Sequence, residues 1–501
     1  MSLSDTKRKL LQRYMQSGAA AGPPSAALAP VRVMQVSAEP APLTYAQEHM
    51  WQLETSRPGI PLLYNECIVL RMPGVLDVRA FERALAEIVR RHEIWRTNYE
   101  VRGGRLLQVV QPAAKDLRLP LLDLRTSPSI VRREEAKQAM RELVWEPFDL
   151  QAGPLFRARL VRIDDFEHWL LVSAHLSIVD GVSVYQILPS ELAALYYAFS
   201  DNQPSPLSPL PVQFGDFARW ERSWLQESEF SRQTSYWHCQ LSGELPVLAW
   251  PTDRPRPLGQ TFRGAIRPFA FSRALSEAVQ QMGPRFGVSL FAILTAGFVT
   301  LLRHYSRQDE MILGTFSPSG RKRSEFVKLL GHFINPVPLR FDLTGEPSFC
   351  EFARRVQIVV SEAIANDDVP LDLLTRKIKL ASDPSRNPLF TVGVSLQPPM
   401  PRSDPDWTVT SMDVESGGAF WDLYMAFISR PGVVKGRVQY NPDLFYSKTI
   451  AHMLDHLRQV LQRAIVDPKQ SIAMLASHLE DGERPSADLE REAPEDSEDD
   501  D

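Results

Sequence analysis

The sequence predicts an α/β protein built from two lobes. The chain has 501 residues, of which 44% are hydrophobic and 23% charged, so it is long enough for two to four core-forming units. Stretches with strand periodicity alternate with stretches of helical periodicity in both halves of the chain, as in α/β folds. A proline-rich stretch at 204–211 lies between the two halves and is the expected connection.

In the first half, the clearest helix signal is the stretch 76–97, where Leu76, Phe81, Leu85 and Ile88 recur at helical spacing. Residues that alternate or run apolar as strands do occupy 105–112 and 156–164, and an apolar run at 168–174 reads as a buried strand. The segment 183–200 has helical character and leads into the connection. These elements are enough for one α/β lobe.

The second half contains the same kinds of helical and strand segments. We expect helices near 274–283, 289–306, 348–364 and 447–465, and strands at 310–318, 389–397 and 433–442. The repetition predicts a second lobe of the same class.

The two ends of the chain differ from this body. Residues 5–16 read as a short amphipathic helix followed by a Gly/Ala/Pro linker, and 480–501 carry 12 acidic and 2 basic side chains. Such a charged tail is too poor in apolar residues to pack, so we expect it to be disordered. The expected division is an N-terminal helix and linker that could serve in docking (1–39), a first lobe (40–222), a second lobe (223–479) and the acidic tail (480–501).

Composition excludes several classes of protein. No apolar run reaches the length of a membrane span, and no apolar stretch follows the basic N-terminus as in a secretory signal. The three cysteines are far apart, which argues against disulfide or metal frameworks and favours a cytoplasmic setting. Lysines and arginines are scattered rather than striped with aromatics, so nucleic acid is not an expected partner. Removing the tail's charge of −10 from the net −5 leaves a body of +5, which suits an acidic protein partner.

Several segments, taken together, resemble the condensation domains of nonribosomal peptide synthetases. The likeness covers roughly residues 40–479 and includes six core motifs of the family and its link segment. The matching stretches, in chain order, are LTYAQEHMWQLE (43–54), RRHEIWRTNYE (90–100), FGDFARWERSWL (214–225), WPTDRPRPLGQTFRGA (250–265), LLGHFINPVPLR (329–340), NDDVPLDLL (366–374) and DPSRNPLFTVGVSLQ (383–397). The resemblance implies two lobes of chloramphenicol-acetyltransferase type, arranged as a V around a central tunnel.

The family's third motif, His-His-x-x-x-Asp-Gly, is degenerate in this chain. Its place is filled by HLSIVDG, with His175, Asp180 and Gly181 matching and Leu176 at the second histidine. In the family that second histidine lines the tunnel and assists attack of an amine or hydroxyl on a carrier-bound acyl thioester. The aspartate is usually structural, and Arg321 is the best match for its ion-pair partner.

We therefore take His175, Asp180 and Gly181 as the candidate catalytic residues. Side chains alternate across a strand, so His175 should point away from the place of the missing histidine, which favours a buried hydrogen-bonding role over direct chemistry. Asp180 is expected to pair with Arg321, since such a pair holds geometry. Gly181 would let backbone approach the substrate, and its N–H is a candidate oxyanion donor.

Other residues are candidates for lining the tunnel or for a different chemistry. Positions that match the family near its tunnel, or lie close to such matches, are Ser183, Asn335, Pro336, Ser395 and Trp421 together with Asp422. The spacing of His175, Asp180 and Ser183 is similar to that of the heterocyclisation branch, but the first residue there is an aspartate. His452 and His456 have metal-compatible spacing without a third ligand nearby, so no metal site is predicted.

These observations leave two functions open. The first is an acyltransferase that joins a carrier-bound acyl or peptidyl thioester to an amine, or less favourably a hydroxyl, with positioning in place of general base catalysis. The second is a non-catalytic relative that recruits or gates partners, which the loss of the histidine at Leu176 favours. In both, the resemblance implies no cofactor of the protein's own, and partners that are acyl or peptidyl carrier proteins bearing phosphopantetheine. The sequence does not indicate the oligomeric state.

Overall fold

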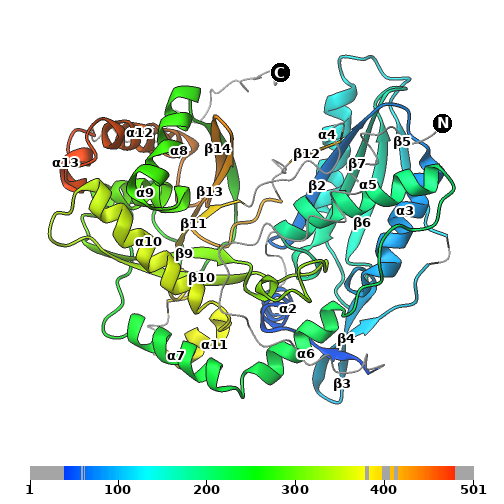
Figure 1. Ribbon diagram of the computed structural model, residues 1–501, viewed down its shortest axis with the longest axis horizontal. Coiled ribbons are helices and arrows are strands. Elements are labelled where there is room, and N and C mark those ends of the chain that lie inside the picture. Colours follow the sequence, from blue (N-terminus) through cyan, green and yellow to red (C-terminus); the bar gives the residue numbers. More distant parts are fainter. Residues whose placement is uncertain are drawn as a thin grey trace.

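The computed structural model describes residues 39–57, 60, 62–114, 116–378, 383–397, 407–410 and 416–479. They form two α/β lobes that open away from each other as a V (Figure 1). The predicted fold class is confirmed. The helix expected at 5–16 and the tail at 480–501 lie outside the described residues.

The first lobe is built on a five-stranded sheet with the order β12-β2-β7-β6-β5. Neighbouring strands run antiparallel, except that β5 and β6 are parallel. Helices α3 and α5 pack together in this lobe, and α4 packs against β2 and β7. The bounds are β2 (Asn65–Pro73), α3 (Val78–Arg91), β5 (Leu121–Asp123), α4 (Arg132–Trp145), β6 (Phe156–Arg162), β7 (Glu167–His175), α5 (Leu188–Ser200) and β12 (Thr408–Thr410).

Helix α3 shows how the sequence dictates this lobe. Asp77 caps its first turn by accepting hydrogen bonds from the N–H groups of Arg79 and Ala80, which satisfies two donors that have no intrahelical partner. The apolar stripe predicted from spacing faces inward, with Phe81 and Leu85 fully buried. The helix is therefore held by capping at one end and by core packing along one face.

The second lobe contains a six-stranded sheet with the order β10-β9-β11-β13-β14-β8. Helices α8, α9 and α12 lie on its outer side, so the other face of the sheet is turned toward the first lobe (Figure 1). Its elements are β8 (Ala265–Ala270), α8 (Arg273–Phe286), α9 (Leu290–Ser306), β9 (Glu310–Ser317), β10 (Asn335–Asp342), α10 (Phe349–Ala365), α11 (Leu371–Lys377), β11 (Val392–Leu396), β13 (Leu423–Arg430), β14 (Val433–Tyr440), α12 (Ser447–Val466) and α13 (Ile472–Ala476).

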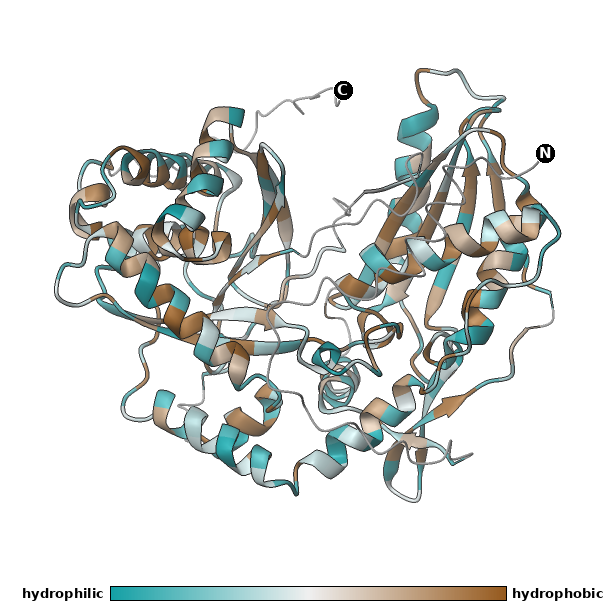
Figure 2. Cartoon of the chain, in the orientation of Figure 1, coloured by the Kyte–Doolittle hydropathy of each residue, from teal (hydrophilic) through white to brown (hydrophobic). Residues whose placement is uncertain are grey.

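Alternation along the central strands of this sheet separates an apolar face from a polar one. Val394, Met425 and Val438 point into the core beneath the helices. Hydrophobic residues of these strands are brown in Figure 2. Ser395, which pairs with Ala426, and Arg437, which pairs with the same alanine from the other side, share the opposite face. The face turned toward the first lobe therefore carries polar side chains.

The remaining elements connect the lobes. Helices α6 and α7 run beneath both of them in the view of Figure 1, and α2 lies between the lobes above α6. A small sheet of β1, β4 and β3 lies beside α6. The bounds are β1 (Ala41–Pro42), α2 (Tyr45–Ser56), β3 (Thr97–Arg102), β4 (Arg105–Val110), α6 (Phe214–Trp224) and α7 (Ser228–Gln240).

Two segments of the second half pack into the core of the first lobe. One includes Phe326 and Phe333, which are buried with residues of the first lobe. The other is β12, which adds an edge strand to the first lobe's sheet, with Trp407 just before it buried against Phe81 and Tyr196 at centroid distances of 6.1 and 5.5 Å. Side chains from the second half of the chain therefore form part of the first lobe's core.

No single helix among the described segments is long and apolar enough to cross a membrane, and only α8 and α9 together, bent by 109°, meet the length and composition criteria.

Candidate functional site

The degenerate motif lies where strand β7 ends between the lobes. His175 is the last residue of the strand and its side chain is fully buried. Its Nδ1 is 2.7 Å from Ser177 Oγ, and its Nε2 is 3.1 Å from a carboxylate oxygen of Glu54 on α2. The imidazole thus joins the end of β7 to helix α2, and both of its nitrogens are engaged.

Leu176 begins the short 3₁₀ turn that follows the strand. Its N–H donates to the carbonyl oxygen of Tyr64 at 2.7 Å. Its side chain is partly buried in an apolar cluster contributed by both lobes, whose other members are Met50, Leu53, Ile60, Leu63, Tyr64, Phe262 and Phe420. A leucine in such a cluster can neither accept nor donate a proton, so position 176 offers no acid–base group.

Asp180 and Arg321 join the lobes through a buried ion pair. Arg321 donates to the two carboxylate oxygens of Asp180 at 3.0 Å from Nε and 2.8 Å from Nη2. The N–H groups of Ser183 and Phe333 also donate to this carboxylate, at 2.7 and 3.2 Å. Burial opposes ionisation of Asp180, but the charge and hydrogen bonds of Arg321 and the bonds from Ser183 outweigh it, so the pKa of Asp180 is lowered.

Ser183 belongs to the same network and not to an open surface. Its hydroxyl donates to the carbonyl oxygen of Gly331 at 3.0 Å and accepts from Arg321 Nη2 at 2.8 Å and from the N–H of Gly331 at 3.1 Å. The side chain is fully buried. Its role in this arrangement is to hold the segment that carries Arg321 against the start of the turn after Gly181.

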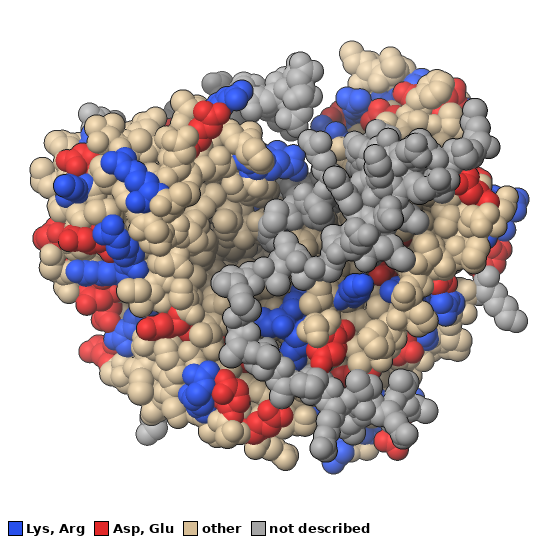
Figure 3. Space-filling view, in the orientation of Figure 1, with Lys and Arg blue, Asp and Glu red and all other residues tan. Residues whose placement is uncertain are grey.

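Gly181 sits directly between Asp180 and the second lobe. A β-carbon at this position would lie 3.7 Å from the ring of Tyr185 and 3.8 Å from Oε1 of Gln397, which are ordinary contacts. Gln397 follows β11 of the second lobe and hydrogen-bonds to Tyr424, whose hydroxyl is 2.6 Å from Ser395 Oγ. Gly181 therefore faces a polar wall formed by the second lobe, and Figure 3 shows the molecule hollowed between the lobes.

Trp421 and Asp422 precede strand β13, and the indole of Trp421 lies over Gly393 on the sheet face that carries Ser395 and Tyr424. The indole of Trp421 stacks on Phe316 with a centroid distance of 4.9 Å and is buried. Asp422 accepts two hydrogen bonds from Arg256, at 3.0 and 2.5 Å. The indole of Trp421 also packs edge-to-face on Tyr424, with a centroid distance of 5.4 Å, so it belongs to the same wall.

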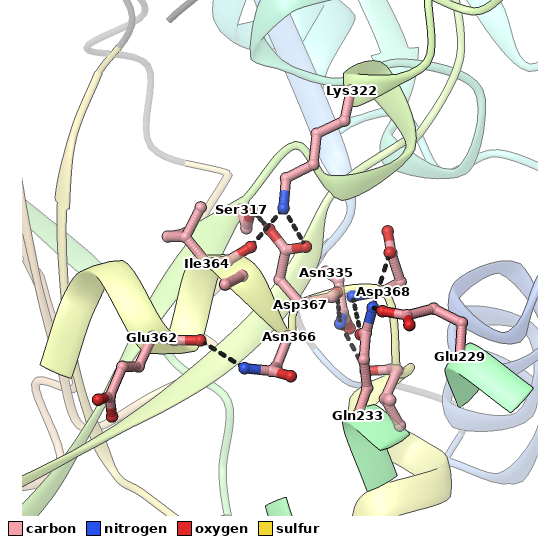
Figure 4. A network of polar contacts seen from close by, with 12 residues as sticks. Glu229, Gln233, Ser317, Lys322, Asn335, Glu362, Ile364, Asn366, Asp367 and Asp368 are labelled. Atoms are coloured by element: carbon pink, nitrogen blue, oxygen red, sulfur yellow. Dashed lines mark hydrogen bonds and ion pairs between the residues drawn. The ribbon is translucent and has the colours of Figure 1, made fainter. Parts of the chain in front are cut away.

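Asn335 and Pro336 start strand β10, beside a polar network drawn in Figure 4. Asn335 Nδ2 donates to the carbonyl oxygens of Asp367 and Val369 at 2.8 and 2.7 Å, and its Oδ1 accepts from the N–H of Leu371 at 3.1 Å. Its carboxamide thus holds the loop at 367–371. Pro336 pairs in register with Phe316 of β9 and is partly buried.

The same network fixes the residue next to Arg321. Lys322 Nζ is 2.6 Å from a carboxylate oxygen of Asp367, and the hydroxyl of Ser317 donates to the other (Figure 4). Burial raises the pKa of Asp367 to about 6, against the opposing charge of Lys322. Lys322 therefore points back into the second lobe while Arg321 reaches the first, so one short turn is anchored on both sides.

Two further ionisable residues at the site are not predicted from the sequence. His332 is buried, with Nδ1 3.2 Å from the carbonyl oxygen of Val179, and it also hydrogen-bonds to the backbone of Leu176. Burial lowers its pKa. Glu66 near the start of β2 is the other, and burial raises its pKa. The position of His332 inside the motif at 329–340 is a signal in the sequence. Glu66 has no such signal, because only the pairing of β2 with β7 places it near the site.

Among the residues that the structure describes, no group of three His, Cys, Asp or Glu side chains is arranged to hold a metal ion.

The structure therefore belongs to the class of proteins with two α/β lobes, here joined over a buried Asp–Arg pair beside a glycine that faces the opposite lobe. The Condensation domain family model matches residues 37–484, and the chain belongs to the condensation domain family.

Relatives place the chain among synthetase domains. It is 37% identical over 450 residues to a linear gramicidin synthase protein of Brevibacillus parabrevis, and the match covers 89% of this chain but only 9% of that much longer protein. The X-domain from teicoplanin biosynthesis aligns with a TM-score of 0.75 at 26% identity over 87% of this chain and 97% of the other. That domain has also been solved in complex with OxyB, with a TM-score of 0.74 at 26% identity. SgcC5 from Streptomyces globisporus aligns with a TM-score of 0.74 at 26% identity, over 86% of this chain and all of the other.

Proposed function

We propose that this chain transfers an acyl or peptidyl group from a carrier-protein thioester to an amine acceptor, as a condensation domain of nonribosomal peptide or hybrid polyketide biosynthesis. The observation that carries the proposal is the complete network around Asp180 and Arg321, which holds Gly181 beside the polar wall of Gln397 and Tyr424. A buried ion pair of this kind holds geometry more than it adds stability, because replacing it with apolar residues is often neutral or stabilising.

The chemistry tolerates the loss of a histidine at position 176. Holding two tethered substrates in an attack geometry can contribute roughly 7–11 kcal/mol of the barrier, whereas a positioned general base contributes about 10²–10⁴ in rate. An amine attacks as a neutral nucleophile and sheds its proton afterwards. A hydroxyl must lose its proton during attack, so we expect hydroxyl acceptors to be poorer substrates for this chain.

The partners in this proposal are acyl or peptidyl carrier proteins whose phosphopantetheine arms bring the substrates into the space beside Gly181. The net charge of +5 on residues 1–479 suits acidic carriers, because complementary charge speeds encounter. The segments 1–39 and 480–501 are candidate docking elements in the same proposal.

A second function is supported by a specific observation. Leu176 packs in an apolar cluster that spans both lobes, and the 26% identical X-domain has been solved in complex with OxyB. A condensation-type domain without transfer chemistry could use its outer surface to recruit a partner protein. In that case carrier proteins bind but their acyl groups stay in place.

The test is a transfer assay with an acyl-loaded carrier protein and a panel of amines and alcohols, followed by intact mass of the carrier. Acyl release that depends on the amine and continues in Leu176→Ala supports transfer without an acid–base group at position 176. The matched blocking variant is Gly181→Trp, which fills the space between Gly181 and Gln397 and should abolish release. Carrier binding without any release by the wild-type chain overturns the transferase proposal and favours recruitment.

A further inference from the structure

Glu66 lies close to the position that lacks its histidine. In the antiparallel pair of β2 and β7, Glu66 is directly opposite Ala174, and Leu176 is two residues beyond that alanine. The N–H of Leu176 donates to the carbonyl oxygen of Tyr64 at 2.7 Å, so backbone pairing continues one residue beyond β7, and Glu66 lies two residues from the residue paired with Leu176. Because side chains alternate, Glu66 and Ala174 share one face of the sheet, while His175 points to the other.

The second lobe faces this carboxylate with a cation and a phenol. Arg437 on β14 acts electrostatically on Glu66, and Glu66 in turn acts on Tyr424 of β13, the residue that hydrogen-bonds to Gln397 opposite Gly181. Burial raises the pKa of Glu66, and the charge of Arg437 opposes that rise. The side chain nevertheless keeps part of its surface accessible. Glu66 therefore interacts electrostatically with Tyr424, the residue bonded to the Gln397 side chain that lies opposite Gly181.

We propose that Glu66 is the proton acceptor of the transfer reaction, in place of a histidine at position 176. This inference rests on the proposed function. The amine nitrogen attacks the thioester carbonyl carbon and forms a C–N bond, and the positively charged nitrogen passes one proton to the Glu66 carboxylate. The C–S bond then breaks, and the departing phosphopantetheine thiolate takes that proton from the carboxylic acid, so Glu66 returns to its starting state.

Three other ionisable groups of the site, Asp180, His175 and His332, are held by hydrogen bonds. The imidazole of His332 is bonded to the backbone of Val179 and of Leu176. Asp180 is saturated by Arg321 and by two backbone donors, so protonating it would break the link between the lobes. His175 is fully buried with both nitrogens engaged. Among the described residues, no hydrogen bond fixes the Glu66 carboxylate, and its raised pKa brings it nearer the working pH, as a general base requires.

The decisive experiment compares Glu66→Gln with wild type in single-turnover transfer from an acyl-loaded carrier to an amine. We expect a fall of about 10²-fold or more in rate. The wild-type pH–rate profile should decline toward acid with an apparent pKa above the ordinary value of about 4.3 for glutamate, and this decline should vanish in Glu66→Gln. Glu142→Gln, an exposed glutamate on α4, is the matched control and should keep the wild-type rate and profile.

If Glu66 had only a structural role, Glu66→Gln would change the affinity for the carrier or the urea midpoint of unfolding. Carrier affinity and the urea midpoint of unfolding should stay unchanged in Glu66→Gln, and the double variant Glu66→Gln/Leu176→His should recover activity because the imidazole supplies the missing acceptor. A wild-type chain that transfers while Glu66→Gln keeps its full rate and acid limb overturns the assignment and leaves the proposed function standing. A wild-type chain that transfers to no amine overturns both.

Discussion

Replacing Arg321 with methionine tests whether the ion pair to Asp180 holds the two lobes together. The substitution keeps an unbranched side chain but leaves a carboxylate that is 1% exposed without its cation. Removing one partner of a buried pair costs about 3–5 kcal/mol. The N–H groups of Ser183 and Phe333 still donate to that carboxylate, so we expect a loss near the lower end, about 3 kcal/mol.

The assay is urea denaturation of four proteins: wild type, Arg321→Met, Asp180→Asn and the double variant. A coupling free energy above about 1 kcal/mol is expected because the two side chains share their hydrogen bonds. The pKa of Asp180 is lowered in the folded protein, so its contribution to stability is present above the unfolded-state pKa of about 3.9 and is lost as the pH falls below it. Arg321→Met should lose this acid dependence. Additive single variants with unchanged acid dependence would refute the reasoning.

Packing and charge elsewhere in the molecule lead to three more expected outcomes. Gly393→Ala should cost about 1–3 kcal/mol, because its β-carbon would lie 2.0 Å from an indole carbon, whereas Gly259→Ala, with open space around it, should be neutral in the same thermal unfolding measurement. Trp407→Ala should cost about 3–5 kcal/mol and speed limited proteolysis near β12, since the indole is buried in the first lobe; unchanged cleavage would contradict this. Lys322→Met should raise the pKa of Asp367 beyond about 6, so unfolding free energy should fall more steeply with rising pH than in wild type, which urea titrations at about pH 5 and 7.5 would detect.

Periodicity predicts many of the longer elements because they are amphipathic. Strands β4, β6, β9 and β14 coincide closely with predicted stretches, and helix α3 ends at Arg91, six residues before the end of the stretch predicted at 76–97. Helix α5 begins five residues later than expected, because Ser183–Ile187 forms a π-helical turn. Helix α4 and strand β13 are among the elements that are not predicted, as are β2, β10, α2 and α6. Helix α4 has few apolar residues, and strand β13 runs apolar on both sides of Tyr424, where helix and strand cannot be told apart by pattern alone.

Contacts between the lobes are the part that periodicity could not supply. The resemblance placed Arg321 opposite Asp180, yet nothing in the pattern indicates that Phe333 and Trp407, far along the chain, belong to the core of the first lobe. Strand β12 is three residues long and pairs with β2 across more than 300 positions of sequence. Such a pairing depends on where the chain passes from the second lobe to the first, and the local strand propensity of three residues does not determine that.

Position 176 shows how much a site depends on register as well as on motif. Comparison with the family motif shows only that position 176 lacks a histidine. Strand pairing adds that the Glu66 carboxylate lies opposite Ala174, two residues from position 176. The change to leucine removes an imidazole and extends an apolar cluster contributed by both lobes, while the polar wall of the second lobe stays beside Gly181. The absence of a base at position 176 does not remove the carboxylate of Glu66 on the adjacent strand, because the two side chains belong to different strands. A degenerate motif therefore does not by itself decide whether such a domain has lost its chemistry.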